Sequence, residues 1–448
     1  MKLFAAFISA FKTPDLRKKL IFTLAIIVVY RMGATLPSPG VSYGNVQRCL
    51  DIVNKGDQAG VFTLLNLFSG GALLQLSVFA LGIMPYITAS IILQLLTVVI
   101  PRLELLRKEG QSGQAKITQY TRYLTLGLAI LQASAFVALA RSGQLFGNQC
   151  DGADLQIIPD SSGWRSGLPM WLTVAVLVIT MTAGTGVIMW LGELVTDRGV
   201  GNGMSVLIFT SITARLPSEG YQIWQKSKYT FAFVIGIGLI IIAFVVFLEQ
   251  AQRRVPVQYA KRMVGRRMYG GTSTYIPLKV NQAGVIPVIF ASSLLYLPQL
   301  ITSFMGNSTN SVKNFIVRHV TNQADPIHIG TYFLLIIFFT YFYVSITFNP
   351  TEVADNMKKY GGFVPGIRPG KPTAEYLDFI LSRITLPGAL YLGIISILPN
   401  LFIGLVGGNK QNFPFGGTAV LIIVGVGLET VKQVESQLMQ RNYEGFLR

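Results

Sequence analysis

The sequence predicts an all-α integral membrane protein with ten transmembrane helices, and three observations predict this class. Charged residues make up 13% of the 448 residues, against about 25% in an ordinary soluble protein. Hydrophobic residues reach 51%, and the mean hydropathy is +0.51. Ten stretches are apolar and long enough to cross about 30 Å of hydrocarbon as helices. The composition therefore excludes a cytosolic enzyme, a disordered chain and a disulfide-stapled secreted domain.

The ten stretches follow one another along the whole chain. The fifth and tenth are the weakest, because Arg215 and Glu429 lie near their ends and the fifth is short. Counts of eight or nine are the alternatives, but dropping a weak span disturbs the sorting of the loop charges. The predicted spans are 20–36, 78–100, 120–140, 168–191, 200–216, 229–248, 285–305, 329–348, 385–406 and 416–434.

The loop charges predict the orientation and the division into halves. With both termini inside, 26 of the 37 Lys and Arg residues lie on the inner side and 11 on the outer side. This bias follows the positive-inside rule. Five spans precede the loop near Pro217 and five follow it, so the second set starts in the opposite direction. The sequence therefore predicts two inverted halves, 1–216 and 217–448, with the functional pathway between them.

Residues that carry chemistry are sparse. The centres of the predicted spans lack ionisable side chains, which makes a proton- or ion-coupled carrier a poorer fit. The two histidines share one outer loop, and the glycine-rich stretch 199–203 lacks the spacing of a dinucleotide loop. We therefore expect no catalysis, cofactor or metal, and we expect a partner to supply any work. Cys49 and Cys150 fall in predicted outer loops, where either a disulfide or two free thiols is compatible with the compartment.

Three segments depart from a regular span. The stretch 62–75 is apolar but too short to cross, so we expect a short re-entrant helix there. The fifth span follows the glycine-rich stretch 199–203, which we expect to be a tight connection between helices. The seventh span contains Pro287 and Pro298, and each removes a backbone donor. Short or broken spans of this kind are typical of the pathway in a membrane protein.

Two pairs of apolar residues lie on these irregular segments at a spacing of four. Ile83 with Ile87, and Met204 with Ile208, each share one face of a helix. Ordinary core or lipid contacts are one interpretation. The other is a ring of aliphatic side chains around a constriction, which excludes ions yet can move aside for a large substrate.

The inner loops 249–284 and 349–384 are strongly basic. Seven cations with two interleaved tyrosines lie between Arg253 and Lys279. Such a surface suits RNA phosphates, acidic protein surfaces or anionic lipid. Charges that serve only to set the topology are the alternative interpretation.

Seven motifs together resemble the bacterial SecY family, the central subunit of the protein-conducting channel. They are NLFSGGA (66–72), FALGIMPYI (79–87), KEG (108–110), QYTRY (119–123), GVGNG (199–203), PLKVN (277–281) and FVPGIRPG (363–370). The resemblance runs from the first span to the tenth. It implies two five-helix halves around an hourglass pore that the re-entrant segment closes as a plug.

The resemblance also implies roles for individual residues. The pore ring comprises Ile83, Ile87, Met204, Ile208, Ile289 and Ile422, where Met204 departs from the family's frequent isoleucine. The plug includes Asn66, Phe68, Ser69, Gly70, Gly71 and Leu73. A lateral gate between the second and seventh spans includes Thr88, Ile91, Gln94, Asn281, Ile286 and Ser292. Arg253, Arg254, Arg266, Arg267 and Arg368 resemble residues that dock a motor or the ribosome.

The function implied by the resemblance is translocation of unfolded secretory polypeptides across the bacterial plasma membrane. Transmembrane segments and signal sequences leave laterally into lipid. The implied partners are the small membrane subunits SecE and SecG, the SecA ATPase motor, the ribosome, signal sequences, nascent polypeptides and anionic lipids. A secondary transporter of a small solute is the alternative, and an insertase or scaffold without a continuous pore is a third possibility.

Overall fold

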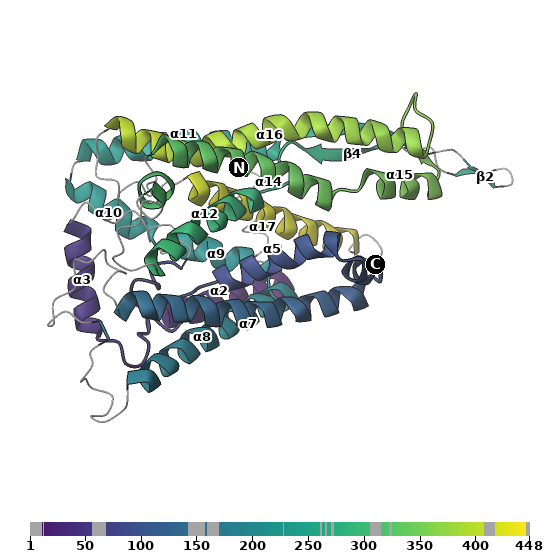
Figure 1. Ribbon diagram of the computed structural model, residues 1–448. Helices are drawn as coiled ribbons and strands as arrows, with labels where there is room; N and C mark the ends of the chain where they lie inside the picture. The colour runs from purple at the N-terminus through teal and green to yellow at the C-terminus, as the bar shows by residue number, and fades with distance from the viewer. Residues whose placement is uncertain are drawn as a thin grey trace.

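The computed structural model describes most of the chain, and the following statements concern that part only. The described residues are 11, 13–55, 69–141, 157–158, 170–226, 228–259, 262–264, 267–269, 273–304, 315–321, 325–406 and 417–444. A helix lies at each of the ten predicted spans (Figure 1). These helices are α2 (Pro14–Thr35), α5 (Met84–Val99), α7 (Gln111–Arg141), α8 (Met170–Arg198), α9 (Gly203–Thr213), α11 (Lys228–Gln250), α12 (Ile286–Phe304), α14 (Pro326–Thr347), α16 (Lys371–Val406) and α17 (Gly417–Glu444).

Length and composition alone identify fewer membrane spans than ten. Among the described residues, six helices are long and apolar enough to cross a membrane, or seven if the bent pair α5 and α6 (Pro101–Lys108) counts as one. The other three predicted spans are α2, α9 and α12. Helix α9 has only 11 residues, and the inner end of α2 carries a run of charged residues.

A sharp bend of 100° separates α5 from α6. Ile100 ends α5 in an extended conformation, with φ −100° and ψ 110°, and Pro101 opens α6. The residue before a proline is forced away from helical angles, and proline itself suits the first turn of a new helix. The second predicted span therefore ends where the sequence places it, at residue 100.

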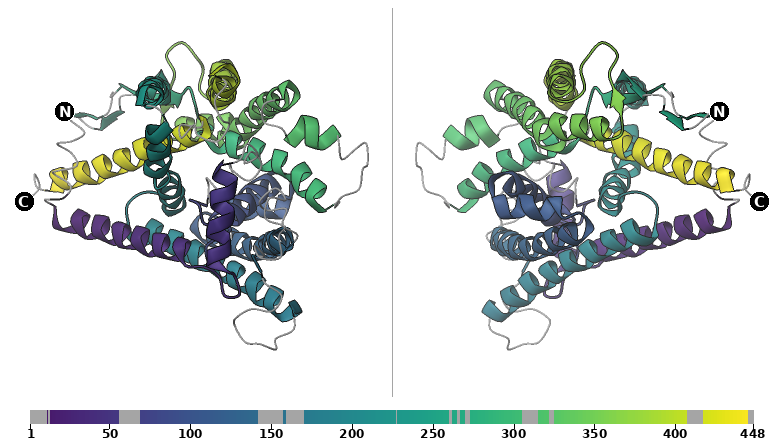
Figure 2. Two further views of the ribbon diagram at one scale, coloured as in Figure 1. Left: turned by 90° about the vertical axis from the view of Figure 1, so that its left-hand side faces the viewer. Right: turned by 90° about the vertical axis from the view of Figure 1, so that its right-hand side faces the viewer.

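The spanning helices form two groups. In Figure 2 the green helices of the C-terminal group lie on one side of the purple and blue helices of the N-terminal group, and yellow α17 lies between them. Within the first group α7 packs on α5 and α8, and α8 also packs on α2 and α9. Within the second group α14 packs on α12 and α16, and α17 packs on α11 and α16. The groups meet where α17 contacts α9 and where α12 contacts α5.

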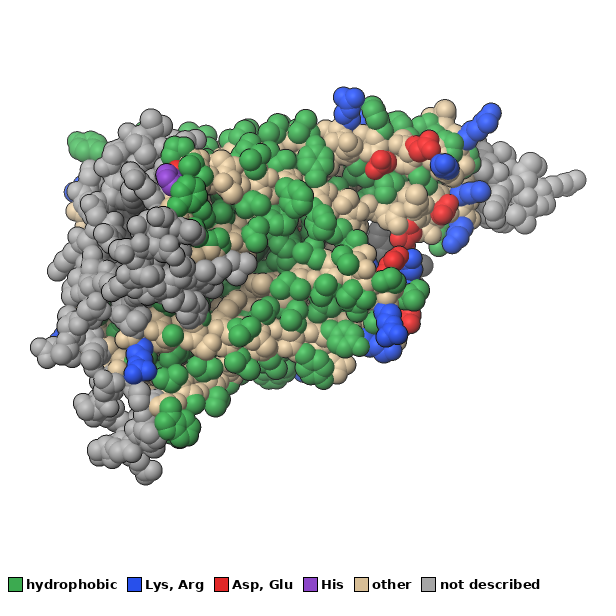
Figure 3. Space-filling model, in the orientation of Figure 1, with side chains coloured by type: hydrophobic (Ala, Val, Ile, Leu, Met, Phe, Trp, Pro, Cys, Tyr) green, Lys and Arg blue, Asp and Glu red, His purple; other side chains and the backbone are tan. Residues whose placement is uncertain are grey.

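The surface has an apolar belt and one charged end. Figure 3 shows hydrophobic side chains over the middle of the molecule and Lys, Arg, Asp and Glu gathered at the end that carries α6 and α15 (Pro350–Lys359). Large apolar residues such as Ile179, Ile240 and Leu334 are more than 60% exposed. Exposed apolar area on this scale is the surface that a lipid bilayer covers.

The charged end also contains a small antiparallel sheet that the sequence analysis did not predict. Its strand order is β4–β1–β5, with β1 (Gln252–Tyr259), β4 (Ser273–Lys279) and β5 (Gly362–Phe363). Strands β2 (Arg262–Val264) and β3 (Arg267–Tyr269) form a separate hairpin. The sheet buries Val255 and Val257 in one apolar cluster with residues of α15 and α16. It therefore joins the two basic inner loops into one unit.

The described part of the predicted re-entrant segment is not helical. Residues 69–75 form successive turns that continue to residue 83. Gly70, Gly71 and Leu76 have φ values of +66°, +94° and +45°, which a right-handed helix does not allow. Residues 62–68, including Asn66 and Phe68, lie outside the described residues.

Two short helices and a π-helical turn complete the described elements. Helix α3 (Tyr43–Lys55) and helix α10 (Leu216–Lys226) both lie at the end opposite the sheet (Figure 1), and the π-helical turn η3 covers Ile316–Thr321. Cys49 on α3 is fully buried and disulfide-bonded. This excludes a free thiol at position 49, whereas Cys150 lies outside the described residues.

Candidate functional site

An apolar cluster lies where the two groups of helices meet. It contains five of the six predicted ring residues as buried members, namely Ile83, Met204, Ile208, Ile289 and Ile422, and Ile87 packs against it. These side chains are between 1% and 9% exposed, apart from Ile87, which is partly buried. They come from α9, α12, α17 and the start of α5, so both groups contribute. The structure thus brings together side chains that are up to 339 positions apart in the sequence.

Close packing between α8 and α9 positions Met204 in this cluster. A Cβ added to Gly203 would lie 1.8 Å from the carbonyl oxygen of Gly192, and one added to Gly192 would lie 2.5 Å from Met204 Sδ. The glycines therefore let α9 approach α8 more closely than any other residue would allow. This close approach turns the first residues of α9 toward the cluster.

Polar side chains fix the turn between α8 and α9. The Asn202 side chain accepts hydrogen bonds from the backbone of Met204 at 3.2 Å and Ser205 at 3.5 Å, which makes it the N-cap of α9. Thr196 Oγ1 accepts one from Gly203 N at 2.9 Å. The glycine-rich stretch 199–203 is therefore confirmed as a tight connection between two helices.

The turn segment 69–83 lines the outer side of this cluster. Ala72 is buried within the apolar cluster, together with Phe79 and Tyr30. Leu73 and Leu76 face a second cluster with Val46 and Cys49. The segment therefore lies between the ring residues and the outer end of the first helical group. Of the predicted plug residues, Ser69, Gly70, Gly71 and Leu73 lie in this segment.

The predicted gate residues lie on the two elements that meet across the groups, or next to them. Ile91 on α5 is buried in the same apolar cluster, Thr88 is partly buried, and Gln94 is exposed. Ser292 on α12 donates to the carbonyl oxygen of Ile289 at 2.9 Å. The two helices that carry most of these residues, α5 and α12, contact each other across the two groups.

Asn281 has a more specific position than the sequence indicated. It is 4% exposed in the turn before α12, and its Nδ2 donates to Glu249 Oε2 at 3.0 Å and to the carbonyl oxygen of Gly284 at 3.2 Å. Asn281 thereby ties the start of α12 to the end of α11. Ile286, the first residue of α12, is partly buried.

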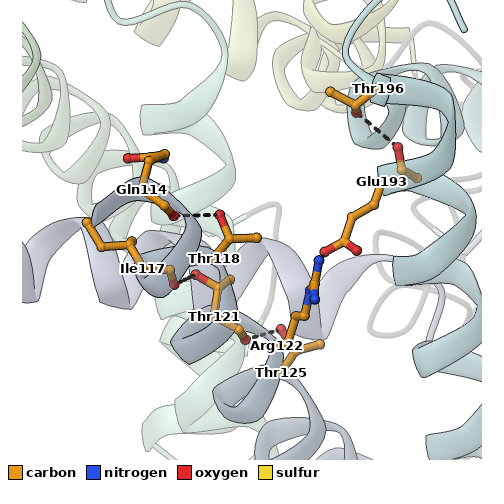
Figure 4. A network of polar contacts seen from close by, with 9 residues as sticks. Gln114, Ile117, Thr118, Thr121, Arg122, Thr125, Glu193 and Thr196 are labelled. Carbon is orange, nitrogen blue, oxygen red and sulfur yellow. Dashed lines mark hydrogen bonds and ion pairs between the residues drawn. The ribbon is translucent and has the colours of Figure 1, made fainter. Parts of the chain in front are cut away.

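An ion pair that the sequence analysis did not predict links α7 to α8. Arg122 Nε donates to Glu193 Oε1 at 2.8 Å, and Figure 4 shows the two side chains reaching toward each other. Around them, Thr118 and Thr121 donate to carbonyl oxygens four residues earlier on α7. The partners are 71 positions apart, so no local spacing signalled the pair.

The basic residues of the inner loops divide into those the structure describes and those it does not. Arg253 and Arg254 are exposed on β1, and the Arg254 guanidinium lies 4.8 Å from the centre of the Tyr275 ring. Arg368 is exposed, and its carbonyl oxygen accepts a bond from Thr373 Oγ1 at 2.9 Å. Arg266 lies outside the described residues, and the side chain of Arg267 on β3 is not described. Pairing of β1 with β5 brings the two basic loops together.

No metal-binding chemistry accompanies this arrangement in the part of the chain that the structure describes. There, no group of three or more His, Cys, Asp or Glu side chains is placed to hold a metal ion. The candidate site is instead an apolar cluster between two helical groups, lined on one side by a turn segment. This arrangement defines the class: a multi-pass helical membrane protein with an apolar cluster at the junction of its two helical groups.

Comparisons with known proteins give the family. The family model described as SecY matches residues 77–431. The protein translocase subunit SecY of Streptomyces scabiei is 64% identical over 448 residues, covering 99% of both chains. The chain belongs to the SecY family.

Solved structures agree with this assignment at the level of the fold. A structure described as that of a protein conducting channel has a TM-score of 0.63 at 19% identity, and it covers 93% of this chain and 91% of its own. Sec61 in the canine ribosome-channel complex has a TM-score of 0.60 at 19% identity, with the same coverage. In both comparisons the shared region is nearly the whole chain.

Proposed function

We propose that this protein is the pore-forming subunit of a protein-conducting channel. It translocates unfolded secretory polypeptides across the plasma membrane and releases apolar segments laterally into lipid. The observation that carries the proposal is the buried apolar cluster at the junction of the two helical groups, in a chain 64% identical to a protein translocase subunit. The comparisons do not favour the solute transporter that the sequence left as the alternative.

The ring residues act as the seal of the pore. Ile83, Ile87, Met204, Ile208, Ile289 and Ile422 form a constriction too apolar for ions, and their side chains can move apart when a polypeptide enters. Segment 69–83, with the residues before it, forms the plug on the outer side. The seam between α5 and α12, with Thr88, Ile91, Gln94, Ile286 and Ser292, is the lateral gate, and Asn281 braces its inner end.

The molecule acts as two inverted halves, 1–216 and 217–448, in the bacterial plasma membrane, with both termini in the cytoplasm. The excess of Lys and Arg in the predicted inner loops supports this orientation. The protein is a conduit and not an enzyme, so a partner supplies the work of translocation. The centres of the predicted spans lack ionisable side chains that could pass protons or ions across the membrane. This favours a partner as the source of the work.

The exposed basic unit at the inner end is the docking surface for those partners. Arg253, Arg254, Arg266, Arg267 and Arg368 contact the SecA ATPase or the ribosome, and anionic lipids contact the same end. The canine Sec61 structure is described as a ribosome-channel complex, which supports the ribosome as a partner. The small membrane subunits SecE and SecG complete the assembly.

The proposal is tested by reconstituting the complex into lipid vesicles and measuring two quantities in one preparation. These are ion leak at rest and protease protection of a secretory precursor after adding the motor and ATP. Wild-type vesicles should protect the precursor and hold an ion gradient. Replacing Ile208 and Ile289 by glycine should raise the resting leak about tenfold, because two of the side chains that exclude water are removed. Absence of precursor protection with correctly inserted wild-type protein would refute the proposal.

A further inference from the structure

Residues 76–79 of segment 69–83 are bonded to the end of α2, and we call them the root of the segment. Ser38 N donates to the carbonyl oxygen of Leu76 at 3.0 Å, and Val78 N donates to that of Leu36 at 2.9 Å. A Cβ added to Gly33 on α2 would lie 2.2 Å from the Phe79 ring. These bonds and close contacts join residues 76–79 to the end of α2, so this part of the segment has no room to move independently.

Ser69 and Gly70 are the first described residues of the segment, and we call them its tip; Gly70 contacts Arg31 on α2 and Ser211 on α9. Arg31 Nη1 donates to the carbonyl oxygen of Gly70 at 3.4 Å. Gly70 has a φ of +66°, and a Cβ there would lie 2.8 Å from Arg31 Nη1 and 3.2 Å from Ser211 Cα. Gly70 thus fits between α2 and α9 because it has no side chain. Gly71 lies between the tip and the root, with a φ of +94° and open space around it. The backbone can therefore rotate at Gly71.

A buried hydrogen bond fixes the two helices that hold the tip. Tyr30 Oη lies 2.6 Å from Ser211 Oγ, and both residues are fully buried. The Tyr30 ring also stacks against Phe79 of the root, with ring centres 6.0 Å apart. Tyr30 therefore sets the spacing between α2 and α9, and the next residue, Arg31, reaches the tip across that spacing.

The environment of Arg31 makes this contact conditional on the position of the tip. Arg31 lies four residues before the end of α2, is half-buried, and forms no ion pair with any carboxylate among the described residues. A guanidinium in apolar surroundings requires acceptors. With the tip in place, the Gly70 carbonyl is such an acceptor. When the tip moves away, water entering the open pore can take over this role.

We propose that Arg31 is a latch that holds the plug tip in the closed pore, with Tyr30 and Ser211 setting its geometry. The inference deepens the proposed function and rests on it. Loss of the latch raises the population of molecules whose plug is displaced, because it removes a contact made only in the closed state. The resting channel then leaks, and a weaker signal sequence suffices to open it.

The experiment compares four single variants and one double variant of the full complex in vesicles of phosphatidylethanolamine and phosphatidylglycerol. Arg31→Gln removes the charge, Arg31→Lys keeps it, and Gly70→Ala disturbs the acceptor. Arg141→Gln is the matched control, since Arg141 is an exposed arginine at the outer end of α7. The readouts are resting ion leak per inserted molecule and transport of a precursor whose signal sequence carries one charged substitution in its apolar run.

Arg31→Gln and Gly70→Ala should each raise the leak about three- to tenfold, in keeping with the loss of one charge-assisted hydrogen bond. Arg31→Lys should restore part of the seal, and Arg141→Gln should leave it unchanged. Combining Arg31→Gln with Gly70→Ala should raise the leak by less than the two single changes together, because both disturb the Arg31–Gly70 contact while Gly70→Ala also crowds Ser211. The precursor with the charged substitution in its signal sequence should be transported several-fold faster by the leaky variants than by the wild-type protein.

The outcomes separate the latch from the function on which it rests. Unchanged leak in Arg31→Gln, with normal transport of an intact precursor, refutes the latch and leaves the channel function standing. Additive leaks in the combined variant also refute it, since they show two independent effects. If wild-type vesicles transport no precursor, the proposed function fails, whatever the leak of the variants. Leak is scored per inserted molecule, so a variant that inserts poorly is still measured.

Discussion

At the scale of single residues, two glycines at the contact between α8 and α9, Gly192 on α8 and Gly203 on α9, meet different atoms. A Cβ at Gly203 would lie 1.8 Å from a backbone oxygen of α8, whereas one at Gly192 would lie 2.5 Å from the flexible side chain of Met204. Backbone cannot yield without moving a helix, but a methionine side chain can rotate. The two positions therefore form a matched pair in which the same substitution has different consequences.

We predict that Gly203→Ala lowers the midpoint of thermal unfolding in detergent by several degrees, corresponding to about 2 kcal/mol or more. Gly192→Ala should lower the unfolding midpoint by less than half as much, since the Met204 side chain can rotate away from the added methyl group. Fluorescence-monitored unfolding of the two purified variants makes the comparison. Equal losses would contradict the packing described for α8 against α9.

The sequence did not predict which residues far apart along the chain contact each other. Apolar spacing and family resemblance indicated the ring residues, and the structure brings them together. Tyr30 and Ser211 are 181 positions apart, and Arg31 and Gly70 are 39 apart. No local sequence pattern indicates either pair, because each contact depends on how α2 packs against other elements. The available signal was a cation within a predicted span, since Arg31 lies toward the end of the span 20–36.

At the scale of elements, the long apolar helices were predictable and the inner sheet was not. Lipid requires each span to satisfy its own backbone groups, so about 20 apolar residues indicate a helix. Strand β1 carries Pro256, which argues against a central strand. It is tolerated because β5 pairs only with Gln258 and Tyr259, which leaves one side of Pro256 unpaired. The alternation of Val255 and Val257 with polar residues was the signal for a strand.

The inner sheet gives a prediction about docking, because it presents the basic loops together. Arg368 is exposed in a turn with Gly366 and Gly370 at φ values of +82° and +104°, next to β5. Arg368→Glu should reduce partner-driven translocation at least tenfold by reversing the charge, while membrane insertion stays normal. Arg383→Glu is the control, since Arg383 lies further along α16. Wild-type translocation by Arg368→Glu would argue against a docking role.

At the scale of the whole molecule, the two helical groups touch along limited seams. The groups meet through α9 with α17 and through α5 with α12, and the apolar cluster with the predicted ring residues lies between them. The sequence could predict two sets of five spans, since loop charge fixes their direction. It could not predict which helices face each other, because pairing depends on the shapes of packed surfaces. The apolar cluster at this junction depends on the arrangement of both groups.

Crosslinking tests most directly whether a polypeptide passes between the predicted ring residues. A photoreactive residue at Ile289 is compared with one at Ile240, which is 71% exposed on the outer face of α11. Secretory chains stalled at several lengths are then irradiated in the membrane. The account predicts adducts at position 289 that shift along the chain with stall length, and none at position 240. Absence of adducts at position 289 for every length, with correctly inserted protein, would contradict it.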